Sequence, residues 1–323
     1  METKVNSVML GQEEIVRLMM IATLSRGHIL LEGDVGVGKT TLLKTVAELI
    51  GGSFERIEGT VDLMPHDLIY YTYINKEGKP AVDAGPILKH GNDLSIFFFN
   101  EINRARPQVH SLLLRIMAER SVTAFNKTHH FPHLQVFADR NSIEKDETFE
   151  LPAAARDRFM MELKVKQPES QALLTQLMFN TIYHDADRLI DSVSKDVLNF
   201  KDLNQVAATI QSTIDASPLI QDYAYHLCRA LRQPDSYGIT LSDVDMKSLI
   251  KGGMGPRGIS YLAKAARVNA WIKGRTAIVP EDFHSVLSSC AKHRIFLNPA
   301  YDFNRDQIID ELIHAVLNTI QAP

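Results

Sequence analysis

The residues of this chain that could do chemistry begin with a glycine-rich stretch that ends in a Lys-Thr pair. The pattern G-x-x-x-x-G-K-[ST] of a phosphate-binding loop is matched by Gly33-Asp34-Val35-Gly36-Val37-Gly38-Lys39-Thr40-Thr41. In such a loop, backbone N–H groups surround phosphate oxygens, the lysine contacts the β- and γ-phosphates, and the hydroxyl that follows binds Mg²⁺. The sequence therefore predicts that these nine residues bind a nucleoside triphosphate and that Thr40 is a metal ligand.

A strand and a helix are expected to hold this loop. Residues 28–32 form an apolar segment of strand length before the glycines, and residues 41–50 follow with apolar side chains at helical spacing. Gly51 and Gly52 then end the helix. The alternative is a chance match in a glycine-bearing turn, but strand, spacing, Lys-Thr pair and helix all agree with a nucleotide site.

A second polar pair, Asn100 and Glu101, follows the continuous apolar run of residues 95–99. Such a run is typical of a parallel strand covered on both faces, and ligands bind at the carboxyl edge of such sheets. In P-loop proteins the first position normally carries an Asp that holds Mg²⁺, and the second a Glu that activates water. The alternative is a buried strand that ends in ordinary loop residues.

The amide of Asn100 lacks the charge that strengthens a carboxylate's hydrogen bonds. We therefore expect Asn100 to be a weakened metal ligand and Glu101 to remain the base. Turnover should be about ten-fold slower, without loss of nucleotide binding.

Length and composition limit the class of protein. A chain of 323 residues suggests about two domains, and 45% hydrophobic with 23% charged residues is ordinary for a globular protein. The net charge of −4 provides no basic field, so we expect no nucleic-acid partner. The two cysteines, Cys228 and Cys290, have no metal-binding spacing. With no signal segment and no apolar run of membrane-spanning length, we expect a cytoplasmic protein without stable membrane insertion.

The rest of the chain changes character at about residue 167. Before that point, hairpins are predicted at about 69–84 and about 121–131, between strand-like segments. After it, apolar residues recur at helical spacing in several segments: 170–180, 196–211, 218–231 and 259–272. We therefore predict a domain boundary between residues 166 and 167.

Taken together, these motifs resemble those of AAA+ ATPases of the MoxR family, a helix-2-insert clade. The resemblance covers about residues 8–300 and rests on the phosphate-binding loop and on four further motifs: Glu101-Ile102-Asn103-Arg104-Ala105, Asn141, Asp157-Arg158-Phe159 and Gly255-Pro256-Arg257-Gly258. It implies a P-loop α/β fold, with a three-layer α/β/α core and a parallel sheet in residues 1–166. An all-α lid domain with a C-terminal helix would follow in residues 167–323. The two hairpins resemble the helix-2 insert and the pre-sensor-1 insert.

The resemblance also implies roles for individual residues. Glu101 would be the catalytic base, Asn141 the sensor-1 residue, and Arg257 a sensor-2 arginine that touches the γ-phosphate. Arg158 would be an arginine finger that reaches the nucleotide of a neighbouring subunit, with Arg156 as the rival candidate. Without the resemblance, surface ion pairing is the plainer interpretation of these arginines.

One further residue and several departures from the family pattern stay open. Gln12 lies in a turn before residues 15–24 and is a candidate contact for the nucleotide base, although a simple packing role explains it equally well. The departures put the hydrolysis rate in doubt more than the fold: Asn100, Asp139-Arg140, Ser142 and Ala153.

The implied function is that of a ring-forming, chaperone-like factor, with ATP and Mg²⁺ as cofactors. The ring is expected to be a hexamer. A von Willebrand factor A-domain protein and a client, such as a metalloenzyme that must be matured, are the expected partners. The alternative, which Asn100 favours, is a nucleotide-gated scaffold that assembles on ATP with little hydrolysis.

Overall fold

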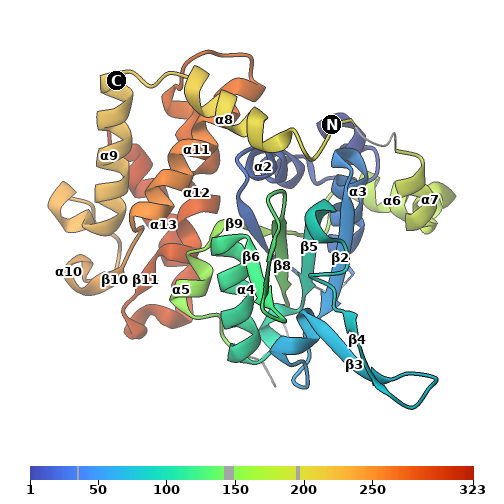
Figure 1. Ribbon diagram of the computed structural model, residues 1–323. Coiled ribbons are helices and arrows are strands. Elements are labelled where there is room, and N and C mark those ends of the chain that lie inside the picture. The colour runs from blue at the N-terminus through green and yellow to red at the C-terminus, as the bar shows by residue number, and fades with distance from the viewer. Residues whose placement is uncertain (35, 142–148, 194–196) are drawn as a thin grey trace. The chain divides into compact units, whose positions relative to one another are not determined.

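The computed structural model describes residues 1–34, 36–141, 149–193 and 197–323 (Figure 1). Contacts divide the chain into two compact units. The first contains residues 1–158 and 163–204, and the second contains residues 159–162 and 205–323.

The first unit is built on a parallel sheet. Its five strands lie in the order β2-β5-β8-β1-β9. Their bounds are β1 His28–Glu32, β2 Ser53–Glu58, β5 Leu94–Asn100, β8 Gln135–Arg140 and β9 Phe159–Lys164. All seven residues of β5 are buried, as expected for a central strand whose two faces are both covered. The predicted α/β fold with a parallel sheet is thus confirmed.

Helices flank this sheet, and two of them follow directly from the sequence pattern. Helix α2 (Glu13–Leu24) packs on β1, and α3 (Lys39–Ile50) packs on β2 and β5. Both bury one apolar stripe, which is why the spacing of their apolar residues predicts helices. The other helices of this unit are α1 Glu2–Asn6, α4 Pro107–Glu119, α5 Ala153–Arg156, α6 Gln171–Phe179 and α7 Ala186–Asp191. Short 3₁₀ turns join them: η1 Pro65–Leu68, η2 Gly91–Asp93, η3 Ile102–Arg104 and η4 Thr181–His184.

Two antiparallel hairpins occur where the sequence predicts them (Figure 1). One pairs β3 (Tyr70–Ile74) with β4 (Pro80–Ala84), and the other pairs β6 (Ser121–Ala124) with β7 (Lys127–His130). Side chains of β3 such as Tyr71, Tyr73 and Ile74 are exposed. That these hairpins are the family's inserts stays a prediction.

The second unit is helical apart from residues 159–162 of β9 and one short sheet. Its main helices are α8 Leu203–Thr213, which begins at the end of the first unit, α9 Pro218–Arg232, α10 Met246–Leu249, α11 Pro256–Ile272, α12 Pro280–Ala291 and α13 Arg305–Thr319. The 3₁₀ turns are η5 Pro234–Tyr237, η6 Lys292–Arg294 and η7 Pro299–Asn304. The sheet pairs β10 (Ile250–Gly252) with β11 (Phe296–Leu297), a detail that the expectation of an all-α lid did not include.

Residues 159–162 group with the second unit because buried polar side chains of that unit bind their backbone. The imidazole of His293 contacts the carbonyl oxygen of Phe159 at 3.0 Å, and the Arg294 guanidinium donates to that of Met160 at 3.1 Å. Both side chains are buried. These long-range bonds give the carbonyl oxygens of Phe159 and Met160 a hydrogen-bond partner.

The predicted boundary between residues 166 and 167 and the contact-based division do not coincide. Residues 163–204, with α6 and α7, group with the first unit. The change from mixed to helical segments marks a change of secondary structure, whereas contacts mark which core a helix joins. The predicted boundary stays a prediction. Within the part of the chain that the structure describes, no helix is long and apolar enough to cross a membrane.

Candidate nucleotide-binding site

The phosphate-binding loop lies between β1 and α3, as the sequence predicts. Gly36 and Gly38 have φ values of +83° and +88°. This left-handed region is costly for residues with a Cβ, so glycine is needed at both turns. The backbone can then turn into the N-terminus of α3, where N–H groups are available to an anion. Val35 lies outside the described residues.

Lys39 is held over the loop by oxygen atoms. Its Nζ lies 2.6 Å from the carbonyl oxygen of Gly33 and 3.0 Å from Oδ2 of Asp139. The Lys39 side chain is 11% exposed and that of Asp139 is 2% exposed, so this ion pair is nearly dry. Thr40 and Thr41, which follow in α3, are half-buried.

The predicted pair at the end of β5 lies in a constrained stretch of backbone. Asn100 is the last residue of the strand and is buried, and Glu101 follows with φ +52°. The Glu101 N–H donates to Oδ1 of Asp139 at 2.6 Å, and the Glu101 carboxylate contacts Arg104 at 3.0 Å. A left-handed conformation in a residue other than glycine persists only where its surroundings hold it, and such residues concentrate at functional sites.

Asp139 is the residue that sequence reasoning underrated, since it was considered as one of three polar residues at a strand end that could orient water or sense the γ-phosphate, and as a departure from the family pattern near sensor 1. In the structure it links Lys39 to the backbone of Glu101. A carboxylate at the end of an apolar strand can be recognised in the sequence as a candidate site residue. Its importance depends on β8 lying between β1 and β5, which is a property of the sheet order.

A cavity of about 360 Å³ opens beside the phosphate-binding loop, and all its lining residues belong to the first unit. Its size lies in the usual range of ligand pockets. The lining is mostly apolar and comes from three segments: Val8, Met9, Leu10, Gln12; Gly36, Val37, Gly38, Thr41; Gln167, Pro168, Leu174, Leu177, Tyr183, Ala186, Leu189. An apolar slot next to a phosphate-binding loop suits a flat nucleobase.

Gln12 belongs to this cavity. It is buried, and its Nε2 donates to the carbonyl oxygen of Lys166. That Gln12 contacts a nucleotide base stays a prediction. The other lining residues, in segments 8–10 and 167–189, could not be predicted from the sequence, because no local pattern shows that apolar side chains far apart in the chain line the same pocket.

The other predicted site residues are distributed as follows. Asn141 directly follows β8 and is buried, while Ser142 lies outside the described residues. Arg158 follows α5 and donates to the carbonyl oxygen of Ala154 at 2.7 Å. Arg156 is the last residue of α5. Arg257 is in the first turn of α11, in the second unit, and its action on a nucleotide stays a prediction.

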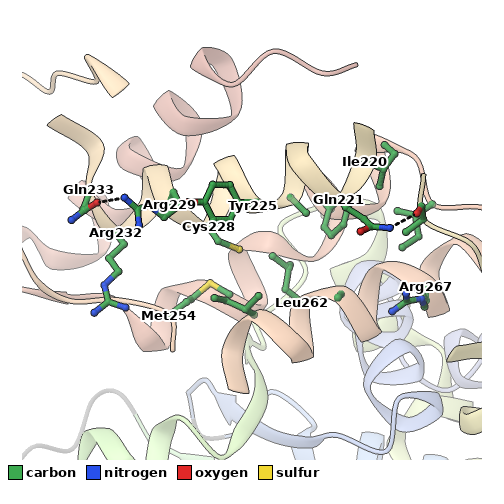
Figure 2. Close-up of a pocket in the computed structure, with 16 residues that line it drawn as sticks. Ile220, Gln221, Tyr225, Cys228, Arg229, Arg232, Gln233, Met254, Leu262 and Arg267 are labelled. Carbon is green, nitrogen blue, oxygen red and sulfur yellow. Dashed lines mark hydrogen bonds between the residues drawn. The ribbon is translucent and has the colours of Figure 1, made fainter. Parts of the chain in front are cut away.

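The second unit has a larger cavity of its own, of about 560 Å³, bordered by α9 and α11 (Figure 2). Its walls are mostly apolar, and Arg232 and Arg267 lie at opposite ends of it in Figure 2. Burial raises the pKa of the Cys228 thiol in this wall to about 11, so the cysteine is protonated at neutral pH. None of the residues predicted to bind nucleotide lines this cavity.

Comparison with known proteins agrees with this geometry. Residues 28–161 match the family described as "ATPase family associated with various cellular activities (AAA)", and residues 245–312 match an AAA lid domain. The chain is 52% identical over 322 residues to "Protein MoxR" of Methylorubrum extorquens, covering all of this chain and 94% of that protein. The same identity relates it to "Protein MoxR" of Paracoccus denitrificans, of which 95% is covered. This chain belongs to the MoxR family of AAA+ ATPases.

Two proteins with lower sequence identity are also similar to this chain over nearly its whole length. "Chaperone MoxR1" of Mycobacterium tuberculosis is 33% identical over 99% of this chain and 81% of its own length. A crystal structure of a putative ATPase from Cytophaga hutchinsonii superimposes with a TM-score of 0.83 at 28% identity, covering 99% of this chain and 93% of that one. The resemblance drawn from the sequence motifs is confirmed, as is the AAA+ fold with a helical lid.

Proposed function

We propose that this MoxR-family chain binds ATP with Mg²⁺, hydrolyses it slowly, and uses the cycle in a ring of identical subunits to remodel a client protein. The observation that carries the proposal is the apolar cavity of about 360 Å³ beside the phosphate-binding loop, with Lys39 and Glu101 at the ends of neighbouring elements. The cavity suits the base, and the loop suits the phosphates.

Separate groups of the protein would bind the base, the phosphates and the attacking water. Gln12 and the apolar lining bind the base, and the loop from Gly33 to Thr41 binds the phosphates. Lys39 exchanges its contact with Asp139 for the β- and γ-phosphates. Glu101 turns from Arg104 toward the attacking water and accepts its proton, while Asn141 orients the water.

The residues near the loop fit Mg²⁺, which prefers oxygen ligands and usually keeps several waters beside phosphate oxygens. Thr40 offers a hydroxyl and Asn100 an amide oxygen. When bound, Mg²⁺ would neutralise charge that develops on the phosphates. The amide of Asn100 is the reason to expect slow turnover.

The proposals about assembly and about a client protein are based on membership of the MoxR family. Arg158 would act on the nucleotide of the next subunit in a hexameric ring, and Arg257 on the γ-phosphate of its own subunit. The relative from Mycobacterium tuberculosis is named a chaperone, which favours remodelling of a client. A von Willebrand factor A-domain partner, a metalloenzyme client and a cytoplasmic location complete the proposal.

The test is ATP turnover per subunit over a range of protein concentrations, for the wild-type chain and for Glu101→Gln. Turnover should rise as subunits associate, because Arg158 completes a neighbour's site, and Glu101→Gln should bind ATP without turning it over. The exposed Glu77→Gln, in the turn of the first hairpin, is the matched control and should behave like wild type.

The second candidate, a nucleotide-gated scaffold, is favoured by Asn100. Tight ATP binding with association but no turnover would select it over the remodelling ATPase. Turnover that stays flat with concentration would reject the shared site. No ATP binding at all would reject both candidates.

A further inference from the structure

Asn100 and Asp139 lie at the same level of the sheet on neighbouring strands. β5 and β8 pair in parallel with Phe99 opposite Ala138. The next residue on β5 is Asn100 and the next on β8 is Asp139, so these two are neighbours across the strands. On its other side β8 pairs with β1, with Asp139 opposite Leu31. Asp139 therefore lies one strand closer to the phosphate-binding loop than Asn100 does.

The negative charge at this edge of the sheet lies at position 139 instead of position 100. Asp139 contacts Lys39 through one carboxylate oxygen and the Glu101 N–H through the other. The Asn100 side chain makes no hydrogen bond to any residue that the structure describes. Where a P-loop ATPase normally has an Asp, this chain has a neutral amide, and the carboxylate stands beside it.

Nucleotide binding changes the balance of charge around Asp139. Lys39 must move toward the β- and γ-phosphates, which removes the only cation that the structure pairs with the Asp139 carboxylate among the described residues. A carboxylate with 2% exposure would then face a polyanion without a counter-ion, which is strongly unfavourable. A divalent cation between carboxylate and phosphates removes this conflict.

We propose that Asp139 is the carboxylate that holds Mg²⁺ in this ATPase, directly or through a bound water, together with the hydroxyl of Thr40. Asn100 is then a neutral neighbour of the metal instead of the ligand named above. The metal-binding charge has moved from β5 to β8, so Asn100 no longer gives a reason to expect slow turnover. This inference rests on the proposed function, since it assumes that ATP and Mg²⁺ bind at this loop. It also assigns Asp139 a second task, as the partner of Lys39 before nucleotide arrives.

The experiment uses Mn²⁺ as the probe, bound to the full chain with a non-hydrolysable ATP analogue. The affinity for Mn²⁺ is measured by electron paramagnetic resonance, and the affinity for the analogue is measured separately in EDTA. Asp139→Asn should weaken Mn²⁺ binding by about ten-fold or more. In EDTA the same variant should bind the analogue as well as wild type or better, because a buried negative charge next to the phosphates is gone.

Two further variants separate a metal ligand from a structural residue. The exchange variant Asn100→Asp/Asp139→Asn keeps one carboxylate at this level of the sheet and should recover most of the lost Mn²⁺ affinity. The control Glu58→Gln removes an exposed carboxylate at the end of β2, on the same edge, and should leave Mn²⁺ binding unchanged.

Unchanged Mn²⁺ affinity in a folded Asp139→Asn variant would overturn the proposal. So would a loss of analogue binding in EDTA equal to that in Mn²⁺, because a merely structural role predicts equal losses. If Asp139→Asn does not fold, Asp139→Glu replaces it: a lengthened ligand should alter the Mn²⁺ spectrum, and an unaltered spectrum would overturn the proposal. Failure of the wild-type chain to bind the analogue with Mn²⁺ would instead reject the proposed function.

Discussion

Lys39, Asp139 and Glu101 show how single residues set the state of the site without nucleotide. The Lys39–Asp139 pair is nearly dry, and the Asp139 carboxylate also fixes the N–H of Glu101. A buried pair of this kind is tolerated because each charge has a partner, and it becomes unstable when one partner leaves. If a triphosphate draws Lys39 away, the change would reach the backbone of Glu101, the proposed catalytic base, through the Asp139 carboxylate.

His28, at the start of β1, makes the fold sensitive to acid. Its ring accepts from the Val136 N–H at 2.9 Å and contacts the Met117 carbonyl oxygen at 3.2 Å. Burial, with added repulsion from Arg120 and Arg26, lowers the pKa of His28 to about 3. In the unfolded chain His28 has an ordinary histidine pKa near 6.5 and therefore binds a proton more readily. The free energy of unfolding consequently falls as the pH drops below about 6.5.

We expect His28 to cost about 2 kcal/mol of unfolding free energy between pH 7.5 and pH 5, relative to a residue that does not titrate. Urea unfolding of wild type and His28→Gln at both pH values measures this. Wild type should be the more stable at pH 7.5, and its advantage should shrink by that amount at pH 5. An advantage that does not change with pH would show that His28 has the same pKa in the folded and in the unfolded chain.

At the scale of elements, the end of β2 supports the end of β5. The N–H of Gly59 donates to the Asn100 carbonyl oxygen at 2.7 Å, and the Glu101 carbonyl lies directly against the Gly59 α-carbon. A Cβ built on Gly59 would come within 2.1 Å of that carbonyl oxygen, which is backbone and cannot turn away. The left-handed conformation of Glu101 therefore depends on a glycine directly after the neighbouring strand β2.

Gly59→Ala should displace Glu101 while leaving the phosphate-binding loop intact. We expect a loss of stability of about 1–3 kcal/mol and a larger loss in turnover than in ATP affinity. Gly252→Ala, in β10 of the second unit, is the control, since a Cβ there makes only ordinary contacts with Phe296 at 3.4 Å or more. Equal falls in turnover and ATP affinity would mean that Gly59 supports the whole site instead of Glu101 alone.

At the scale of the whole molecule, the proposed ring makes each site depend on two chains. Glu101 would act within its own subunit, and Arg158 would act on the next one. Arg158 lies just after α5 and donates to the carbonyl oxygen of Ala154 in that helix. A finger that acts across an interface can be supplied by a different copy of the chain.

Mixing two inactive variants tests this directly. Glu101→Gln and Arg158→Ala should each be nearly inactive alone, because an arginine finger contributes roughly 10³-fold or more to turnover. When the two are mixed in equal amounts, sites with an intact Glu101 and a neighbouring intact Arg158 should restore about a quarter of wild-type turnover. No recovery in mixed assemblies would remove Arg158 from that role, and the same mixture with Arg156→Ala then tests its rival.

Local features of this protein were predictable from the sequence. The strand, the loop and helix α3 lie within one short stretch, and the residue types needed for phosphate binding must be adjacent to work. The same holds for Asn100 and Glu101, which stand at the end of a strand whose apolar run shows that it is buried. The family resemblance adds the fold, because it draws on several such local motifs in a set order.

Only the tertiary structure placed Asp139 beside Lys39, since this depends on β8 lying between β5 and β1 in the sheet. It also assembled the cavity beside the phosphate-binding loop from the N-terminal turn, the loop itself and residues 167–189. It grouped residues 163–204 with the first unit and tied residues 159–162 to the second through His293 and Arg294. The sequence by itself determined which chemistry the chain carries, because that chemistry is local. Which distant residues share the site depended on strand order and helix packing, which no local pattern encodes.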